Sequence, residues 1–415
     1  MKLPHAERPG MGVWLLALAA CRAPGTSVPE PAPAVRPGIE VLLSDSMHLV
    51  RGRRTGLVTN QSGIDRQGTH DVERLRSSGV RLTALFSPEH GFRGSAAPGE
   101  AVASMVDSAT GLPIYSLYGR SMAPDPKTLA ELDVVLIDLQ DVGARYYTWV
   151  ATTVEVMRAA WLQNKPVVIL DRPNPIGGVV QGNVLDPAYR STIGRLSVPV
   201  RHGLTLGELA LLARRELGIA ADVRVVPAAG WTRALALDDA GLPFVPPSPN
   251  LRDLEALFHY PGTCLFEGTA LSVGRGSDAP FQQIGAPWLD PAAVLARLHP
   301  EDVAGVRFNT VSFTPRQPGD GKYADTMVTG IRLQVTDRER YDPVRTAVAL
   351  LVAVRQVHPA EIRFITRHFD LLAGGPGLRE AIEAGLPASR IAAGWRVPIR
   401  QFLQRAKPVR LYPND

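Results

Sequence analysis

The stretch SPEHGFRG at residues 87–94 places a carboxyl group beside an imidazole in a turn. Glu89 directly follows an apolar segment, and Pro88 and Gly91 fix and open the turn around it. Partial removal from water favours the protonated form of a carboxyl group, which can then act as a general acid. We therefore take Glu89 and His90 as catalytic candidates. The alternative is that Glu89 only caps the segment that follows.

The stretch DLQDVGARYY at residues 138–147 begins where an apolar run ends. Asp138 and Asp141 are candidates for a second catalytic group, one that activates water or attacks the substrate. Arg145 and Tyr147 suit a sugar ligand, because a guanidinium group bonds hydroxyls in pairs and a tyrosine ring covers a sugar face. The alternative is a structural network of charges. No histidine lies at metal-ligand spacing, so no metal is expected.

Two further stretches offer groups that could bind a ligand. The turn DRPNPIGG at residues 171–178 has prolines that fix the backbone and glycines that allow close approach, with Asp171 and Asn174 as its polar members. A rigid connection is the alternative. The stretch RHG at residues 201–203 comes just before a predicted helix. Glu208 in that helix has the spacing of a capping-box residue. This leaves His202 as the exposed candidate.

The second half of the chain supplies one carboxylate and one guanidinium from turn-rich stretches, Glu267 and Arg275. Such a pair, entering from a second domain, suits a cleft between domains. Glu267 joins the catalytic candidates and Arg275 the ligand-binding ones. Cys264 is expected to be a buried apolar residue, not a nucleophile, because its neighbours are apolar and no histidine is adjacent.

Several motifs of common enzyme classes are missing from the sequence. It contains no G-x-S-x-G elbow, no H-E-x-x-H helix, no phosphate-binding G-x-x-x-x-G-K-[ST] loop and no G-x-G-x-x-G after the first expected strand. No nucleotide or other cofactor is therefore expected.

The elements that position these residues alternate between strands and helices. Apolar runs rich in β-branched residues are predicted as strands at residues 55–59, 82–86, 134–138 and 166–171, with helices at 71–77 and 152–163 between them. Strands apolar on both faces indicate a parallel sheet covered by helices, that is, an α/β Rossmann-like doubly wound domain. The polar stretches, together with Asn60 and Gln61, follow strand ends, where such folds bind ligands.

A stretch rich in proline and glycine, residues 241–250, marks the passage to a smaller α+β domain. That domain is predicted to contain a strand at 330–336 and a helix at 343–356. The predicted boundaries are 38–245 for the Rossmann-like domain and 246–415 for the domain that closes the cleft.

The N-terminus has the features of an export signal. A basic start precedes an apolar run at residues 11–20 that is too short to span a bilayer, so residues 1–20 are predicted as a signal peptide. The run ends in LAAC, which resembles a bacterial lipobox with Cys21 as the lipidated residue. An ordinary signal with a chance cysteine is the alternative. Residues 21–37 are a proline-rich tether. Because Arg22 and not aspartate follows the cysteine, we expect an outer-membrane anchor facing the periplasm.

The bulk composition is that of a globular protein. The 415 residues are 45% hydrophobic and 20% charged, with a formal net charge of +5. The arginines are scattered and do not form basic runs, so no nucleic-acid partner is expected. With Cys21 lipidated, Cys264 is the only other cysteine in the chain, which leaves no internal disulfide.

Together these stretches resemble the NamZ-like exo-β-N-acetylmuramidases, over nearly all of the chain beyond the tether. The resemblance implies a Rossmann-like domain joined to a smaller one, a cleft between them, and cleavage of non-reducing-terminal N-acetylmuramic acid from a β-1,4 link to N-acetylglucosamine. It also implies that Glu89 is the catalytic acid. The stretches that carry it are GLVTNQSG (56–63), FSPEHGFRG (86–94), LPIYSLYG (112–119), DLQDVGARYY (138–147), LDRPNPIGG (170–178), RHGLT (201–205), PSPN (247–250) and YPGTCLFEGT (260–269).

Two positions depart from the family pattern. The sequence has Gln181 and Val273 where the pattern has carboxylates. This motivates a second hypothesis, a non-catalytic lipoprotein that binds muropeptides or sugars. A third hypothesis, an acyl or amide hydrolase of the cell envelope, lacks an activated nucleophile.

In the glycosidase hypothesis, the partner of Glu89 is Asp138, Asp141 or Glu267. A carboxylate separation of about 5 Å would retain the anomeric configuration, and one of about 6.5–9.5 Å would invert it. Groups expected to hold the sugar and its lactyl carboxylate, for which arginine is a natural partner, are His90, Arg145, Asn174, His202 and Arg275.

Overall fold

The structure is a computed structural model that describes residues 1–2 and 34–415. Residues 34–415 form one compact unit. The predicted signal peptide, Cys21 and most of the predicted tether fall outside the described residues, apart from the first two residues and 34–37. Within the described residues, no helix is long and apolar enough to cross a membrane.

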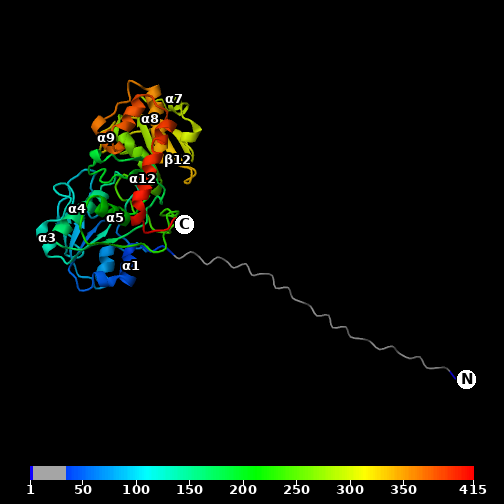
Figure 1. The fold of residues 1–415 in the computed structure, drawn as a ribbon. Coiled ribbons are helices and arrows are strands. Elements are labelled where there is room, and N and C mark those ends of the chain that lie inside the picture. The colour runs from blue at the N-terminus through cyan, green and yellow to red at the C-terminus, as the bar shows by residue number, and fades with distance from the viewer. Residues whose placement is uncertain (3–33) are drawn as a thin grey trace. The chain divides into compact units, whose positions relative to one another are not determined.

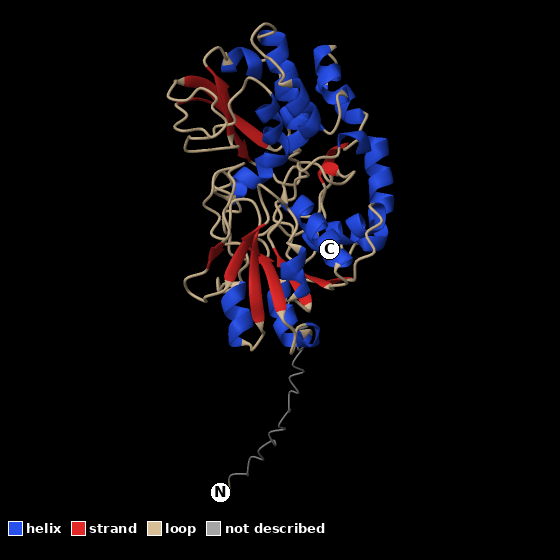
Figure 2. Cartoon of the chain, turned by 90° about the vertical axis from the view of Figure 1, so that its left-hand side faces the viewer, coloured by secondary structure: helices blue, strands red, loops and turns tan. Residues whose placement is uncertain are grey.

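A seven-stranded sheet lies at the centre of the first part of the chain (Figure 2). Its order is β3-β4-β2-β1-β5-β6-β9, and every neighbouring pair is parallel except β3 with β4 at one edge. The predicted doubly wound α/β fold is therefore confirmed. The strands are β1 (Thr55–Thr59), β2 (Leu82–Ser87), β3 (Met105–Val106), β4 (Pro113–Ser116), β5 (Val134–Asp138), β6 (Val167–Leu170) and β9 (Val223–Val226).

Alternate residues of the central strands enter two different cores, one on each face of the sheet. Leu57 and Leu136 pack with α1 (Gly38–Asp45) and α2 (Asp71–Ser77). The residues next to them in sequence enter the larger core on the other face. That face is covered by α3 (Pro126–Ala130), α4 (Trp149–Leu162) and α5 (Leu206–Glu216). Burial on both faces explains why these strands are continuously apolar.

The second part of the chain is built on an antiparallel three-stranded sheet in the order β10-β12-β11. Helix α8 packs against α6, and both belong to the larger core. A two-stranded hairpin, β7 (Gln181–Val184) with β8 (Pro199–Arg201), belongs to the first part. The other elements are α6 (Leu254–Thr263), β10 (Gln283–Ala286), α7 (Pro291–Leu295), β11 (Val306–Phe313), β12 (Val328–Val335), α8 (Pro343–Val357), α9 (Thr366–Ala373), α10 (Gly377–Glu383) and α11 (Ala388–Ala393).

The end of the chain returns to the first sheet through α12 (Arg396–Ala406), drawn in red beside α5 in Figure 1. The Tyr412 hydroxyl donates to Asp171 Oδ2 over 2.6 Å, and the Leu411 amide donates to Glu208 Oε1 over 2.7 Å. Short 3-10 helices complete the described chain at Met47–Leu49, Pro187–Tyr189, Cys264–Gly268, Pro300–Asp302 and Lys407–Val409.

Candidate active site

The turn that carries Glu89 begins where β2 ends, at the carboxyl edge of the sheet. His90 has a φ of 68°, in the left-handed region that residues other than glycine rarely adopt. Its Nδ1 lies 2.9 Å from the Ala96 carbonyl oxygen, to which it donates in the matching tautomer. His90 therefore shapes the turn, which holds a strained backbone next to the candidate acid.

The Glu89 carboxylate is bound by groups from separate parts of the chain. Oε2 accepts from the Thr148 hydroxyl over 2.7 Å, and Oε1 accepts from the Gly99 amide over 3.0 Å. Burial raises the pKa of the Tyr118 hydroxyl to about 12, and the adjacent Glu89 contributes to that shift. Glu89 itself is 9% exposed. Its side chain is thus held in place yet is not fully closed off.

Asp141 and His202 lie beside each other. Asp141 Oδ2 accepts from the Gly143 amide over 2.7 Å and lies 3.3 Å from His202 Nε2. His202 Nδ1 accepts from the Leu204 amide over 3.1 Å, so in the neutral ring the proton is on Nε2, which makes no hydrogen bond to a described residue. The expectation that His202 is exposed is wrong: the side chain is fully buried, because it packs under Asp141 just after β8.

Tyr147 lies in the field of both acids. Its hydroxyl donates to the Pro247 carbonyl oxygen over 3.0 Å. Burial raises the pKa of this hydroxyl well above its usual value, and the charges of Glu89 and Asp141 raise it further. Tyr147 therefore remains protonated, and its ring packs against Tyr260 at a centroid distance of 6.4 Å.

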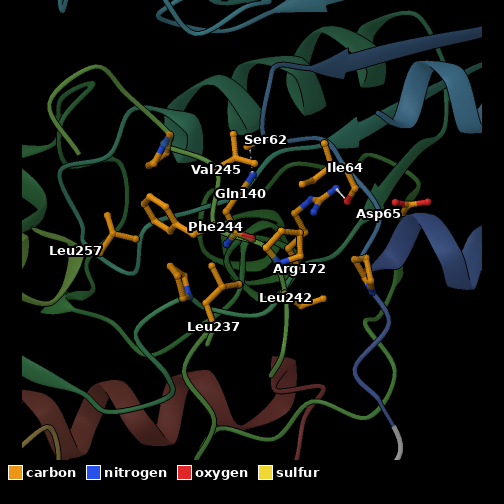
Figure 3. Close-up of a pocket in the computed structure, with 14 residues that line it drawn as sticks. Ser62, Ile64, Asp65, Gln140, Arg172, Leu237, Leu242, Phe244, Val245 and Leu257 are labelled. Atoms are coloured by element: carbon orange, nitrogen blue, oxygen red, sulfur yellow. Dashed lines mark hydrogen bonds between the residues drawn. The ribbon is translucent and has the colours of Figure 1, made fainter. Parts of the chain in front are cut away.

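Asp138 is fully buried and forms an ion pair with Arg172 that uses both carboxylate oxygens. Burial raises the pKa of Asp138, and the positive charge of Arg172 opposes that shift. Arg172 also donates to the Ile64 carbonyl oxygen over 2.7 Å, a contact visible in Figure 3. The pair joins β5 to the turns after β1 and β6, and it leaves no carboxylate oxygen facing outward.

Asp171 and Asn174 are also bound by the protein itself. Asp171 accepts from the Thr205 hydroxyl over 2.6 Å, the Gly207 amide over 2.8 Å and the Tyr412 hydroxyl. Asn174 Nδ2 donates to the Leu204 carbonyl oxygen over 2.9 Å. Both side chains are buried, and their described contacts support the framework of the sheet edge.

The remaining predicted ligand-binding residues of the first part are bonded to other groups of the protein. Arg145 is buried and donates to the carbonyl oxygens of Asn183, Val198 and Leu372, so it ties the hairpin to α9. Asn60 is buried and its Oδ1 accepts from the Ser62 hydroxyl over 2.7 Å. Gln61 Nε2 donates to the Pro246 carbonyl oxygen over 2.9 Å.

Glu267 and Arg275 form a pair in the second part of the chain. Arg275 Nε donates to Glu267 Oε1 over 2.6 Å, and the guanidinium carbon lies 5.0 Å from the centre of the Phe281 ring. Among the described residues, none accepts a hydrogen bond from the two terminal nitrogens of Arg275. Cys264 is buried as expected, with Sγ 3.5 Å from Glu267 Oε2, and burial raises its pKa well above the usual value.

Aromatic residues connect the two groups of charged side chains. Tyr260 packs edge-on against Tyr147 and Tyr146, with centroid distances of 6.4 and 6.0 Å. Burial raises the pKa of Tyr260 well above its usual value, and the neighbouring Cys264 and Glu267 raise it further. The charge of Glu89 acts on Tyr147, the charge of Glu267 acts on Tyr260, and these two rings pack against each other.

Two hollows lie among the loops that follow the strands, and Glu89 lines neither of them. The one in Figure 3 has a volume of about 20 Å³ between Ser62, Gln140, Arg172 and apolar side chains, which is room for one water molecule. The second is a groove of about 960 Å³ that Gln61, His70 and Phe92 help to line. Within residues 34–415, no group of three potential ligands among histidine, cysteine, aspartate and glutamate is placed to hold a metal ion.

Sequence reasoning missed Tyr118 and Thr148 as contacts of Glu89. Tyr118 follows β4 within a stretch that was singled out, so its place at a strand end was an available signal. Thr148 directly follows Tyr147 at the start of α4, but nothing local indicates that its hydroxyl bonds to Glu89.

A carboxyl group held at the carboxyl edge of an α/β sheet, in a chain with further buried acids, is compatible with a glycosidase that uses two carboxyl groups. Comparison with known proteins gives the family. The exo-β-N-acetylmuramidase NamZ models match residues 55–255 (N-terminal) and 258–412 (C-terminal). The chain belongs to this family of glycosidases.

Relatives support the same assignment over most of the chain. The peptidoglycan β-N-acetylmuramidase NamZ of Bacillus subtilis is 40% identical over 383 residues, which cover 92% of each chain. Two solved structures of DUF1343 family proteins from Bacteroides fragilis are also similar. One has a TM-score of 0.84 at 30% identity and covers 91% of this chain and 99% of its own. The other has a TM-score of 0.76 at 33% identity and covers 92% and 99%.

Proposed function

We propose that this protein releases N-acetylmuramic acid from the non-reducing ends of peptidoglycan fragments by cleaving the β-1,4 link to N-acetylglucosamine. The observation that carries the proposal is the placement of Glu89 at the sheet edge, bound on both oxygens and with 9% of its surface exposed. The named activity of the Bacillus subtilis relative supports the choice of substrate.

In the proposed reaction, Glu89 transfers its proton to the glycosidic oxygen while the bond from that oxygen to the anomeric carbon breaks. Positive charge develops on the sugar ring, and a water oxygen ends bonded to the anomeric carbon after its proton passes to a base. General acid assistance of this kind is worth about 10²- to 10⁴-fold in rate.

The contacts rank the candidates for the second group. Asp138 is committed to Arg172 and fully buried, which disfavours it. Asp141 accepts from the Gly143 amide and lies beside His202. Its charge, like that of Glu89, raises the pKa of Tyr147. Glu267 is the most exposed of these acids, with a side chain 16% exposed. We propose Asp141 or Glu267 as the partner of Glu89.

We also propose that Arg275 binds the lactyl carboxylate that distinguishes N-acetylmuramic acid from N-acetylglucosamine. Its Nε donates to Glu267 and its guanidinium carbon lies over the Phe281 ring, which leaves the terminal nitrogens to bond a carboxylate. Asn60, Asn174, Arg145 and Asp171 then belong to the framework that shapes the site.

The test of this function compares wild type with Glu89→Gln on two substrates: a chromogenic aryl β-N-acetylmuraminide and the N-acetylmuramyl-N-acetylglucosamine disaccharide. We expect kcat/KM on the disaccharide to fall by about 100-fold or more. The fall should be smaller on the aryl glycoside, because its leaving group needs less protonation. The matched control is Glu301→Gln, an exposed glutamate of the second part.

The competing hypothesis of a binding protein makes a different prediction in the same experiment. Binding of the disaccharide by both proteins, with no sugar released by wild type, would reject the glycosidase. Release of free N-acetylmuramic acid by wild type rejects both the binding protein and the amide hydrolase.

We further propose that the protein is exported and anchored in the outer membrane through a lipid on Cys21. The support is the sequence pattern of residues 1–21, in which a basic start and a short apolar run end in LAAC. The full chain and Cys21→Ser should be expressed in a bacterial host with a labelled fatty acid. Label and membrane recovery in wild type only would support the proposal, and equal recovery without label would reject it.

A further inference from the structure

The segment that carries Glu267 is fastened by an ammonium group that arrives from elsewhere in the chain. Lys322 Nζ donates to the carbonyl oxygens of Phe266, Glu267 and Leu271 over 3.2, 2.9 and 2.9 Å. An ammonium group has three hydrogens, so these bonds use all of its donors. Burial lowers the pKa of Lys322, and the neighbouring charges of Asp320 and Glu267 oppose that effect.

Lys322 belongs to the connection between β11 and β12, residues 314–327, and this connection makes further bonds of the same kind. The Tyr323 hydroxyl donates to the Ala270 carbonyl oxygen over 2.8 Å. The Arg316 amide donates to the Gly276 carbonyl oxygen over 2.8 Å, next to Arg275. One connection thus holds the backbone on either side of the Glu267–Arg275 pair.

The connection is itself built to a fixed shape. Tyr323 has a φ of 53°, an uncommon conformation for a residue with a side chain, and its hydroxyl also accepts from Trp288 Nε1 over 3.2 Å. The Asp320 carboxylate accepts from the Lys322 amide over 3.2 Å, which closes a tight turn before the lysine. A backbone held in this way presents Lys322 in one position.

We propose that Lys322 is a positioning residue for the reaction, and that it acts by fixing the backbone from which Glu267 and Arg275 face the substrate. The proposal rests on the proposed function, in which Glu267 is a candidate partner of Glu89 and Arg275 binds the lactyl carboxylate. Lys322 itself contacts no reacting atom, because its ammonium hydrogens all bond to backbone carbonyl oxygens.

The test uses Lys322→Met, which keeps most of the aliphatic stem and removes the three donors, with Lys127→Met, an exposed lysine of α3, as the matched control. Displacements near 1 Å in an active site can cost about 100-fold in rate. We expect kcat on the aryl β-N-acetylmuraminide to fall at least about tenfold in Lys322→Met, with a smaller change in KM. Lys127→Met should behave as wild type.

A second measurement does not depend on activity. Hydrogen exchange of the amides of residues 266–276 should be faster in Lys322→Met than in wild type and Lys127→Met. Tyr323→Phe, which removes one bond to the same segment, should change both readouts in the same direction by less. It keeps the proposal testable if Lys322→Met does not fold.

The outcomes separate this proposal from the proposed function. Unchanged exchange in residues 266–276, or faster exchange with kcat within twofold of wild type, would overturn the positioning role. Faster exchange in a protein whose wild type releases no sugar would instead reject the glycosidase on which the role depends.

Discussion

The Glu89 carboxylate is held by a threonine hydroxyl and a backbone amide from two other segments of the chain. Thr148 lies 59 residues away and Gly99 lies 10 residues away, yet both donate to its carboxylate. The Thr148 bond has a local consequence as well. Thr148 occupies the N-cap position of α4, but its side chain makes no capping hydrogen bond, because the hydroxyl donates to Glu89 instead.

Thr148→Val removes this donor at nearly constant volume. We expect it to lower kcat on the disaccharide by about tenfold, because a hydrogen bond to a charged group contributes about 1.5 kcal/mol. The matched control is Thr153→Val in the same helix, whose buried hydroxyl has no hydrogen-bond partner in the described chain. Steady-state kinetics on both variants check this. Equal activity of Thr148→Val and wild type would show that the bond does not position Glu89.

Gln181 and Val273, which depart from the family pattern, are both in contact with other parts of the protein. Gln181 accepts from Arg201 Nη1 over 2.9 Å and donates to the Tyr341 carbonyl oxygen over 3.1 Å. Val273 is fully buried in the apolar core. A carboxylate at position 273 would lose its hydration there at a large cost in free energy. The chain therefore carries its candidate acids elsewhere, at Asp141 and Glu267.

At the scale of elements, the sequence predicted helices and strands where local signals are strong. Thr205 and Glu208 form the expected capping box at the start of α5. The helix predicted from residue 343 to 356 spans Pro343–Val357. The helix predicted from 152 instead begins at Trp149, directly after Thr148, whose hydroxyl makes no capping hydrogen bond. The short strands β3 and β4 were not predicted as elements.

Asp171, directly after β6, is expected to make the stability of the protein depend on pH. Burial raises the pKa of Asp171 to about 6, although three hydrogen bonds lower it. In the unfolded chain, the pKa of an aspartate is about 3.9. Between about pH 4 and pH 6, the folded protein therefore keeps a proton on Asp171 that the unfolded chain has released. The free energy of unfolding contributed by this group is complete below about pH 4 and is lost as pH rises through about 6.

Asp171→Asn should remove this contribution. Urea unfolding at pH 4, 5, 6 and 7 should show a free energy of unfolding for wild type, relative to the variant, that decreases with pH over this range. The total change should be on the order of 3 kcal/mol, since each pKa unit corresponds to about 1.4 kcal/mol. A difference between the two proteins that is constant with pH would contradict the assignment.

At the scale of the whole molecule, the last residues fasten the second part of the chain to the first. Tyr412 packs against Trp231 at a centroid distance of 4.9 Å, donates to Asp171 and accepts from the Ala228 amide over 2.9 Å. The chain thus leaves the first sheet, builds the second part and returns to the first. The boundary predicted near residue 245 stays a prediction, since residues 34–415 form one compact unit.

Tyr412→Phe should lower the free energy of unfolding by about 1–3 kcal/mol, because it leaves the buried Ala228 amide without an acceptor. The control is Tyr115→Phe, whose hydroxyl makes no hydrogen bond to a described residue. Denaturant unfolding checks both. A loss as large in Tyr115→Phe as in Tyr412→Phe would show that the C-terminal contact is not the cause.

The class of fold, the family and most of the stretches that surround the site can be predicted from the amino-acid sequence. Continuous apolar runs and their flanking turns are local properties, and the parallel sheet follows from them. The sequence does not distinguish side chains that face a ligand from side chains whose bonds hold the sheet edge together. Asp138, Asp171 and Asn174 look like Glu89 as residues that follow strands, yet only Glu89 is partly exposed.

Which polar groups bond to each other becomes visible only in the folded chain. Arg172 with Asp138, Tyr412 with Asp171 and Lys322 with the Glu267 segment are pairs separated by 34, 241 and 55 residues. Such contacts depend on how whole layers pack, and sequence spacing carries no record of them. The difference between a buried carboxylate and an available one is set by these distant partners, because a hydrogen bond and the exclusion of water both require atoms that folding brings together.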